Sequence, residues 1–248
     1  MKATAGGMVT ALALAASVSS GAPGEYRVLS TSREAKSLLA NDAAAWKEAQ
    51  RVRWGPKGYE TEFAALWGGD ALYLRFTARD PKPWHTLTRR DEHLWEEEVV
   101  EIFLDPGRQG RDYAELEISP ANVVCDVRML QPSPDKKMDL AWNLEGLETR
   151  TAAWRSGGKE VGWIAVARVP FAAFRSLPST KEVALPPRAG DRWRFNLFRV
   201  DRPGGKAAPE KGAIEVAWSP TGQPSFHVPA AFRDFVFAAA APPGSAAR

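Results

Sequence analysis

The segment from Trp95 to Asp105 places a large aromatic side chain beside four glutamates, where an alternating hydrophobic pattern begins. From Val99 onward this pattern predicts a strand whose Glu101 side chain points away from the core. A carboxylate accepts hydrogen bonds from hydroxyl groups, while an indole ring packs against an apolar surface of the same ligand. Sugars carry both surfaces, so Trp95 and Glu101 indicate a sugar site. A solvated charge run with an ordinary exposed strand residue explains the same segment.

The same alternation on other segments yields further polar side chains that could share a face with Glu101. Glu115, Arg128 and Asn196 each stand opposite an apolar set in their own strand pattern. If these strands are neighbours, the carboxylates, guanidinium groups and amide could hold hydroxyl groups together. A solvated outer sheet shows similar alternation, so the pattern alone leaves both interpretations open. The full set of polar positions is Glu101, Tyr113, Glu115, Glu117, Asp126, Arg128, Arg194 and Asn196.

Strand patterns dominate after Trp46, and 20 glycines and 19 prolines separate them. This spacing favours an all-β fold, a single antiparallel two-sheet β-sandwich of jelly-roll or immunoglobulin-like type. Helical spacing occurs only in Ser32 to Gln50, near the N-terminus, and in the short turn Phe171 to Phe174. The predicted strands are 61–67, 71–79, 99–105, 113–119, 123–129, 162–169, 192–200, 213–219 and 232–237.

The ends of the chain differ in composition from its middle. Residues 1–22 combine Lys2, an apolar stretch from Met8 to Val18 and small residues before Ala22, which is typical of a secretory signal peptide. A short membrane anchor or a disordered leader is the alternative. No low-complexity linker interrupts the chain, so we expect one domain over residues 31–238 and a disordered tail over 239–248. The signal predicts a secreted or periplasmic protein.

Composition excludes several classes of partner and stabilising device. Lys and Arg outnumber Asp and Glu only 33 to 30, too small an excess to indicate nucleic acid, although the pI is near 9.0. No segment after the leader is long and apolar enough to predict a membrane span. Cys125 is the single cysteine, so no internal disulfide can form, and its alternation with Val123 and Val127 predicts a buried thiol.

Four segments, in order, make the sequence recognisable: TEFAALW followed by DALYLRFTARD, WEEEVVEIFLDP, GDRWRFNLFRV and WSPTGQPSFHVPAAF. From Trp46 to Phe237 the chain resembles the family 9 carbohydrate-binding modules and the related family-9-like domains of bacterial exported proteins. The resemblance implies a β-sandwich that holds sugar rings between aromatic side chains. It makes Trp95 one stacking ring, Glu101 the main hydroxyl acceptor, and Asn196 and Arg199 further contacts. The second ring is Trp218 or, failing that, Trp84.

The predicted function is therefore that of an exported, non-catalytic domain that binds an oligo- or polysaccharide. We expect a monomer that serves carbohydrate breakdown by a partner glycoside hydrolase. Some members of the resembled family carry structural calcium, and acidic loops here offer the oxygen ligands that calcium takes. Solvated acidic loops without a metal are the alternative. The aspartates concerned are Asp70, Asp80, Asp91, Asp105 and Asp112.

Two other functions stay open. A glycosidase needs two carboxyl groups about 5 to 9.5 Å apart, which Glu101 and Glu115 could provide from neighbouring strands. A haem-binding electron-transfer domain would use Met129 or Met138 together with His227 or His85. The common hydrolase, zinc and nucleotide motifs are absent from the sequence.

Overall fold

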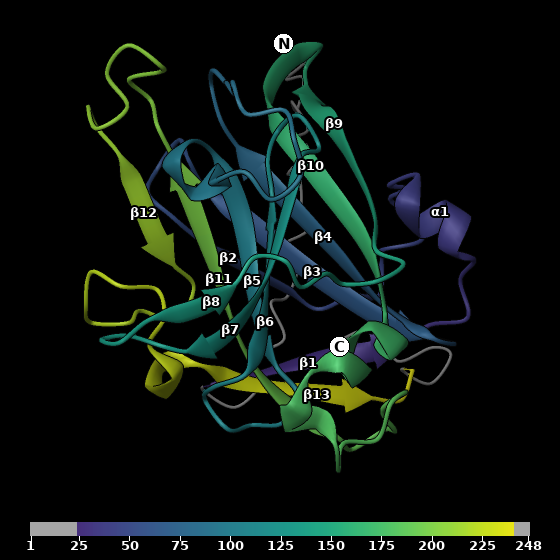
Figure 1. Ribbon diagram of the computed structural model, residues 1–248. Coiled ribbons are helices and arrows are strands. Elements are labelled where there is room, and N and C mark those ends of the chain that lie inside the picture. The colour runs from purple at the N-terminus through teal and green to yellow at the C-terminus, as the bar shows by residue number, and fades with distance from the viewer. Residues whose placement is uncertain (1–23, 241–248) are drawn as a thin grey trace, which may run out of the picture.

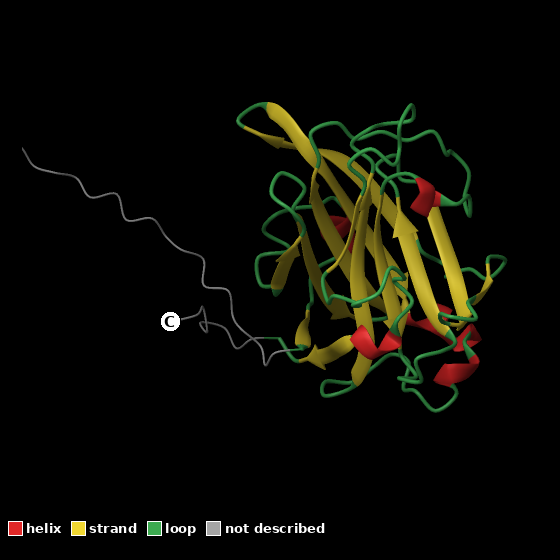
Figure 2. Cartoon of the chain, turned by 90° about the vertical axis from the view of Figure 1, so that its left-hand side faces the viewer, coloured by secondary structure: helices red, strands yellow, loops and turns green. Residues whose placement is uncertain are grey.

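The computed structural model describes residues 24–240, which form thirteen strands, one short α-helix and four 3-10 turns (Figure 1). Strands and loops account for almost all of the described chain (Figure 2). The strands are β1 (Glu25–Ser30), β2 (Arg51–Trp54), β3 (Thr61–Gly68), β4 (Ala71–Arg79), β5 (Val99–Asp105), β6 (Tyr113–Ile118), β7 (Val124–Gln131), β8 (Lys137–Asp139), β9 (Glu148–Ser156), β10 (Lys159–Pro170), β11 (Arg192–Asp201), β12 (Ile214–Ala217) and β13 (Arg233–Ala238). The helical segments are α1 (Ala35–Leu39), η1 (Leu94–Glu96), η2 (Phe171–Ser176), η3 (Pro178–Thr180) and η4 (Pro229–Ala231).

The strands hydrogen-bond along one continuous path that folds back on itself into two layers. Its order is β8-β7-β6-β5-β11-β13-β1-β3-β4-β10-β9, with β12 beside β11 and β2 beside β3. Side chains from both halves of the path meet in one hydrophobic core, as Ile102 of β5 and Leu197 of β11 do with Phe76 of β4 and Trp163 of β10. The core is therefore the contact between two faces of the same path.

The all-β class predicted from the sequence is confirmed, but the arrangement is mixed rather than purely antiparallel. β1 runs parallel to both β13 and β3, whereas every other pairing is antiparallel. A parallel neighbour needs a long connection. β13 comes from the far end of the described chain, and α1 and β2 lie between β1 and β3, so both connections are long enough.

Only five of the residues from Ser32 to Gln50 form an α-helix, whereas the turn predicted at Phe171 to Phe174 lies in the 3-10 helix η2. α1 ends just before Asn41, whose φ of 58° is left-handed and does not continue a helix. The apolar residues of this region cover a sheet instead, because Leu38 and Trp46 pack on Leu66 and Val166 at the outer face of β3 and β10. The Trp46 indole donates to the Leu38 carbonyl at 3.1 Å and ties the loop to α1.

Strand β5, which carries Glu101, is buried on both faces. Val100, Ile102 and Leu104 belong to the main core, whereas Val99 and Phe103 lie under two smaller hydrophobic clusters on the outer face. Segments from two later parts of the chain contribute Met138 and Phe226 to both of those clusters. The outer face of this layer is therefore covered, and Glu101 is not an exposed strand residue.

Some of the remaining expectations concern residues that the structure describes, and others do not. Cys125 is a free, buried thiol, as predicted. Among residues 24–240 no helix is long and apolar enough to cross a membrane. The predicted signal peptide, residues 1–22, lies outside the described residues, as do residues 241–248 of the predicted tail.

Candidate functional site

Three glutamates meet on the covered outer face of β5 and β6. Glu101 stands directly opposite Glu117, and Glu115 stands opposite Phe103, two pairs further along the ladder and on the same face. One carboxylate oxygen from each lies within 4.8 Å of the others. All three side chains are buried, and Glu117 is 0% exposed. We call Glu101, Glu115 and Glu117 the glutamate trio.

Burial and mutual repulsion raise the pKa values of the trio and so favour its protonated forms. Burial first, and then the neighbouring carboxylates, raise the pKa of Glu101 and Glu117 well above the usual range of a glutamate. Burial raises the pKa of Glu115 to about 7. Neither oxygen of Glu117 bonds a described group outside the trio. The trio therefore offers both hydroxyl-like donors and carboxylate acceptors to a ligand.

A pocket of about 220 Å³ opens above two members of the trio. Glu101 and Glu115 line its polar part, and Trp95 and Phe226 supply aromatic rings. The strands β5 and β6 position the carboxylates, whereas the rings come from the turn η1 and from the loop before η4. The other lining residues are Lys136, Met138, Val200, Arg202, Glu215, Pro224, Ser225 and His227.

Both rings are held by neighbours that leave part of them at the pocket. Trp95 is half-buried and stacks on His93 at a centroid distance of 4.5 Å, with the Lys136 ammonium 5.9 Å from its ring centroid. Phe226 stacks on Phe198 of β11 at 4.4 Å. A planar apolar face held in place is what an aromatic binding platform needs.

His227 closes one side of the pocket as a neutral ring. Its Nδ1 atom lies 3.1 Å from the Tyr113 hydroxyl, and its ring stacks on Phe103 at 4.8 Å. Burial lowers the pKa of His227 to about 3. Its Nε2 atom, 4.0 Å from Glu115, therefore carries no positive charge at neutral pH and leaves that carboxylate available to a ligand.

Arg128, a predicted site residue, lies on the other side of the sheet. The ladder pairs Glu115 with Val127 and Ala114 with Arg128, so Val127 shares the face of the trio and Arg128 does not. Arg128 instead donates to Asp112 at 2.5 Å. Alternation shows which residues of a strand share a face. It does not show which face points to the core when charged residues form ion pairs on the inner face, as Arg128 does with Asp112.

Asn196 is on the predicted face, but both ends of its amide bond other parts of the chain. Its side-chain nitrogen donates to the Ser219 carbonyl at 2.8 Å, and its side-chain oxygen accepts from the Leu197 and Ser219 amides at 2.9 and 3.1 Å. Asn196 is buried at 0% exposure. It fixes the chain after β12 to β11 and does not line the pocket.

The two tryptophans proposed as the second ring are also placed elsewhere. Trp218 packs against Phe195 of the main core at 5.0 Å. The Trp84 indole donates to the Arg202 carbonyl at 2.8 Å, which anchors a loop. Phe226 is the second aromatic ring in the pocket, and sequence reasoning missed it. The only signal was its place in the segment WSPTGQPSFHVPAAF.

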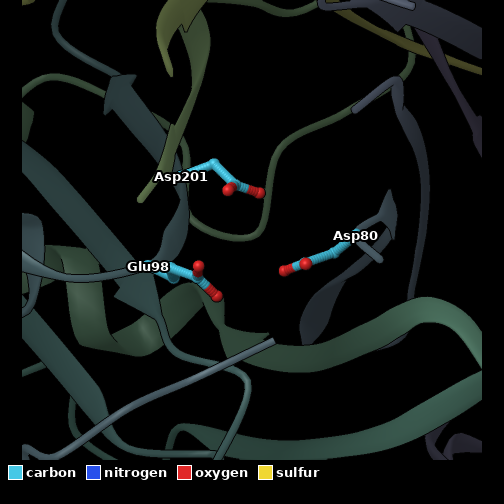
Figure 3. Close-up of side chains that lie close together, drawn as sticks. All are labelled: Asp80, Glu98 and Asp201. Atoms are coloured by element: carbon cyan, nitrogen blue, oxygen red, sulfur yellow. The ribbon is translucent and has the colours of Figure 1, made fainter. Parts of the chain in front are cut away.

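Arg199 belongs to a second carboxylate cluster, which lies between the layers. Asp80, Glu98 and Asp201 point toward one another there (Figure 3). The fully buried Arg199 donates from one terminal nitrogen to Asp80 at 3.1 Å and to Asp201. Its guanidinium also lies 5.1 Å from the Trp163 ring centroid. We call Asp80, Glu98 and Asp201 the inner cluster.

The carboxylate oxygens of the inner cluster are suitable ligands for a divalent cation. Burial and repulsion from its neighbours raise the pKa of Glu98 to about 9, and burial raises the pKa of Asp201. Asp201 Oδ1 is buried without a hydrogen-bond partner. Calcium takes carboxylate oxygens, so three of them converging with one unused acceptor match its chemistry.

Of the five aspartates suggested by the sequence, only Asp80 belongs to the inner cluster. The others are taken by partners within the protein, since Asp70 pairs with Arg168, Asp91 lies near Arg90, Asp105 accepts from the Gln109 and Gly110 amides, and Asp112 pairs with Arg128.

Comparison with known proteins places this chain in a family. The sequence pattern of the family "Carbohydrate family 9 binding domain-like" matches residues 39–184. A protein of Arthroderma benhamiae named "Extracellular protein" is 26% identical over 189 residues, covering 72% of this chain and 78% of that protein.

Solved structures show the same fold. A family 9 carbohydrate-binding module from Caldicellulosiruptor kristjanssonii, in complex with cellotriose, superposes with a TM-score of 0.57 at 14% identity, over 90% of this chain and 98% of that one. The glucose complex gives a TM-score of 0.56 at 15% identity, over 88% and 97%. The family match spans more than half of this chain, which therefore belongs to the carbohydrate family 9 binding domain-like family.

Proposed function

We propose that this protein binds carbohydrate without catalysis and that the pocket above the glutamate trio holds one sugar ring. The observation that carries the proposal is the pocket itself, where Glu101 and Glu115 lie beside Trp95 and Phe226 in a volume of about 220 Å³. Small-molecule sites combine apolar walls with a few converging polar groups in this way. The small volume favours a single ring over an extended chain.

Each lining residue has a role that matches sugar chemistry. Glu101 and Glu115 exchange hydrogen bonds with ring hydroxyls, and each bond to an ionised carboxylate contributes about 1.5–3 kcal/mol. Trp95 covers the apolar face of the ring and adds on the order of 1 kcal/mol beyond area burial. Lys136 and Arg202 donate to oxygens that the glutamates do not reach.

The ligand we propose is a neutral glucose-type unit of an oligo- or polysaccharide. The support is that the Caldicellulosiruptor module of the same fold is described in complex with glucose and with cellotriose. The leader pattern of residues 1–22 and the relative named "Extracellular protein" support export, to the cell exterior or the periplasm. A glycoside hydrolase partner in polysaccharide breakdown completes the proposal.

Two functions that the sequence left open have less support. A glycosidase places its carboxyl groups on either side of the scissile bond, whereas Glu101 and Glu115 project from adjacent strands on the same face. A haem would need its ligands free, but His227 packs flat on Phe103 with its Nδ1 beside Tyr113. The protein should release no reducing sugar and should be colourless when purified.

We also propose calcium as the ion for the inner cluster. Asp80, Glu98 and Asp201 would hold it, and it would balance carboxylate charge that Arg199 alone leaves uncompensated. Its role would be to stabilise the end of the two layers, because the cluster joins the ends of β4 and β11 to the start of β5.

A glycan array followed by titration calorimetry tests the proposed function. The mature protein should bind glucose or cello-oligosaccharides, and Glu101→Gln should weaken that binding by about tenfold or more. Glu145→Gln, at an exposed position outside the pocket, is the matched control and should bind as the parent does. Binding of no neutral saccharide, or unchanged binding by Glu101→Gln, would refute the proposal.

A further inference from the structure

The outer face of the other layer is covered over only part of its length. α1 and Trp46 pack on one part of this face, over Leu66, Tyr73 and Val166. The rest is an open groove of about 730 Å³, more than three times the volume of the sugar pocket. Its lining residues are Arg53, Lys57, Gly58, Glu60, Glu62, Arg75, Thr77, Arg79 and Trp154.

A guanidinium group is held over an indole at one side of this groove. The ladders align Arg79 of β4, Gly162 of β10 and Trp154 of β9 in one row. Because Gly162 has no side chain, Arg79 reaches across it, and its guanidinium carbon lies 5.3 Å from the Trp154 centroid. Arg79 Nε also pairs with Glu60 at 3.4 Å. The two terminal nitrogens of Arg79 make no hydrogen bond within the described residues.

Positive charge exceeds negative charge along the groove. Four cationic side chains line it, against the carboxylates Glu60 and Glu62. Glu62 is shared by Arg53 at 2.6 Å and Arg75 at 3.7 Å. Lys57 forms no ion pair within the part of the chain that the structure describes. An anion in the groove would therefore meet an excess of donors.

The floor of the groove holds a polar group without a partner. Thr77 is 7% exposed, and its Oγ1 hydroxyl makes no hydrogen bond. Leaving a buried hydroxyl unpaired costs stability. A ligand in the groove could supply the missing hydrogen bond, so the position is more typical of a binding site than of a solvated sheet face. Glu62, directly opposite Thr77 on β3, is already engaged by arginines.

We propose that this groove binds an acidic oligosaccharide whose uronate carboxylates pair with Arg79 and Arg53. A sugar hydroxyl would bond Thr77, and a ring edge would pack beside Trp154. The volume accommodates more than one ring, which distinguishes this site from the pocket above the glutamate trio. The two sites lie on the outer faces of opposite layers, so this binding does not depend on the proposed function of that pocket.

Titration calorimetry with tetragalacturonate tests the inference. Binding should weaken with added salt, and Arg79→Ala or Arg53→Gln should weaken it on the order of tenfold. Thr77→Val, which keeps the shape of the side chain and removes the hydroxyl, should weaken it less. Arg155→Ala, an exposed arginine of β9 outside the groove, and Trp95→Ala in the other pocket should leave it unchanged. The melting temperature of each variant verifies folding.

Three results would overturn the inference. The parent protein could show no binding at millimolar tetragalacturonate. Arg155→Ala could weaken binding as much as Arg79→Ala, which would indicate general charge attraction. A single-stranded DNA of equal charge could displace the sugar with equal strength, which would mean that the groove recognises phosphate or charge alone rather than a uronate chain.

Discussion

The molecule contains two clusters of three buried carboxylates, and they differ in how their charge is balanced. In the inner cluster Arg199 lies against two of the three acids and is itself fully buried. Within the described residues no arginine bonds the glutamate trio, and the Lys136 ammonium at the pocket is the cation that partly counters the raised pKa values. The carboxylates of the inner cluster are therefore paired with an arginine of the same chain, whereas those of the trio lie beside a pocket.

This difference separates a structural element from a binding site. A buried charge that already has a partner in its own chain adds rigidity and has little to offer a sugar. Carboxylates that keep protons and unused acceptors beside a pocket leave their hydrogen bonds to whatever enters it. The inner cluster should therefore control stability, and the trio should control affinity.

The largest expected effect comes from removing the internal cation. Arg199→Met should lower the free energy of unfolding by about 3–5 kcal/mol, because it leaves buried carboxylates without their partner. Chemical denaturation measures the change, and Arg27→Met, in an exposed ion pair, should change little. Adding Asp201→Asn to Arg199→Met should restore part of the loss. A loss no larger than that of Arg27→Met would contradict the structural role.

The next largest effect concerns the trio, where a substitution should change sugar affinity rather than reduce stability. Glu101→Gln should weaken sugar binding by about 1.5–3 kcal/mol, while the melting temperature should rise because one repelling acid is gone. Glu117→Gln is the matched variant, since Glu117 does not line the pocket, and it should raise the melting temperature with affinity retained. Equal losses of affinity in both variants would mean that the trio acts as one unit.

The pH dependence of stability follows from the raised pKa of Glu115. Its folded pKa of about 7 lies above the unfolded value of 4.5, so its contribution is complete below pH 4.5 and is lost as pH rises through 7. From pH 6.5 to 8.5 we expect Glu115 to lose about 1 kcal/mol of its contribution. The charged or titrating groups that face Glu115 are Glu101, Glu117, Lys136 and His227.

His227 acts in the other direction and limits the pH range of the test. Its folded pKa of about 3 lies below the unfolded 6.5, so its contribution is present above pH 6.5 and is lost as pH falls. Between pH 6.5 and 8.5 the contribution of His227 still rises as its unfolded form loses the last of its protons, but this gain offsets only part of the loss from Glu115, so the melting temperature should fall. Glu115→Gln should flatten that slope, and an unchanged slope would assign it to other groups.

Trp95→Ala tests the aromatic wall and should cost about 1 kcal/mol of affinity, close to fivefold. The ring is half-buried at the pocket, so the melting temperature should stay near that of the parent. Trp218→Ala should do the reverse, since Trp218 packs on the main core and lies outside the pocket. If Trp95→Ala unfolds the protein, Trp95 is a core residue and Phe226 becomes the ring to test.

The sequence was most informative about strands with one apolar and one polar face. β5 begins and ends where its pattern does, at Val99 and Asp105. β8 and β2 were missed because three or four residues give too little alternation to recognise, and β9 because its pattern is mostly polar along an edge of the path. β1 was missed because it lies between the leader and the first region that we assigned to the domain.

Site prediction from sequence was limited by what alternation cannot show. Glu101 and Glu115 could be assigned to one face because both belong to strands whose core side is plainly apolar. Arg128 lies off this face because β7 turns Cys125 and Val127 toward the trio and its charged residues inward. Arg199 lies inside because Asp80 and Asp201 balance its charge there, which requires a long-range contact between β4 and β11. Phe226 comes from a loop without periodicity.

The smallest expected effect concerns calcium at the inner cluster. Arg199 already balances part of its charge, so calcium at a few times its dissociation constant should raise the free energy of unfolding by only about 1 kcal/mol. EDTA should lower the melting temperature, calcium should restore it, and Asp201→Asn should abolish the response because it removes the unused acceptor. Glu117→Gln should keep the response, which assigns the ion to the inner cluster rather than to the trio. A melting temperature indifferent to EDTA and calcium would show that Arg199 is the only cation the inner cluster needs.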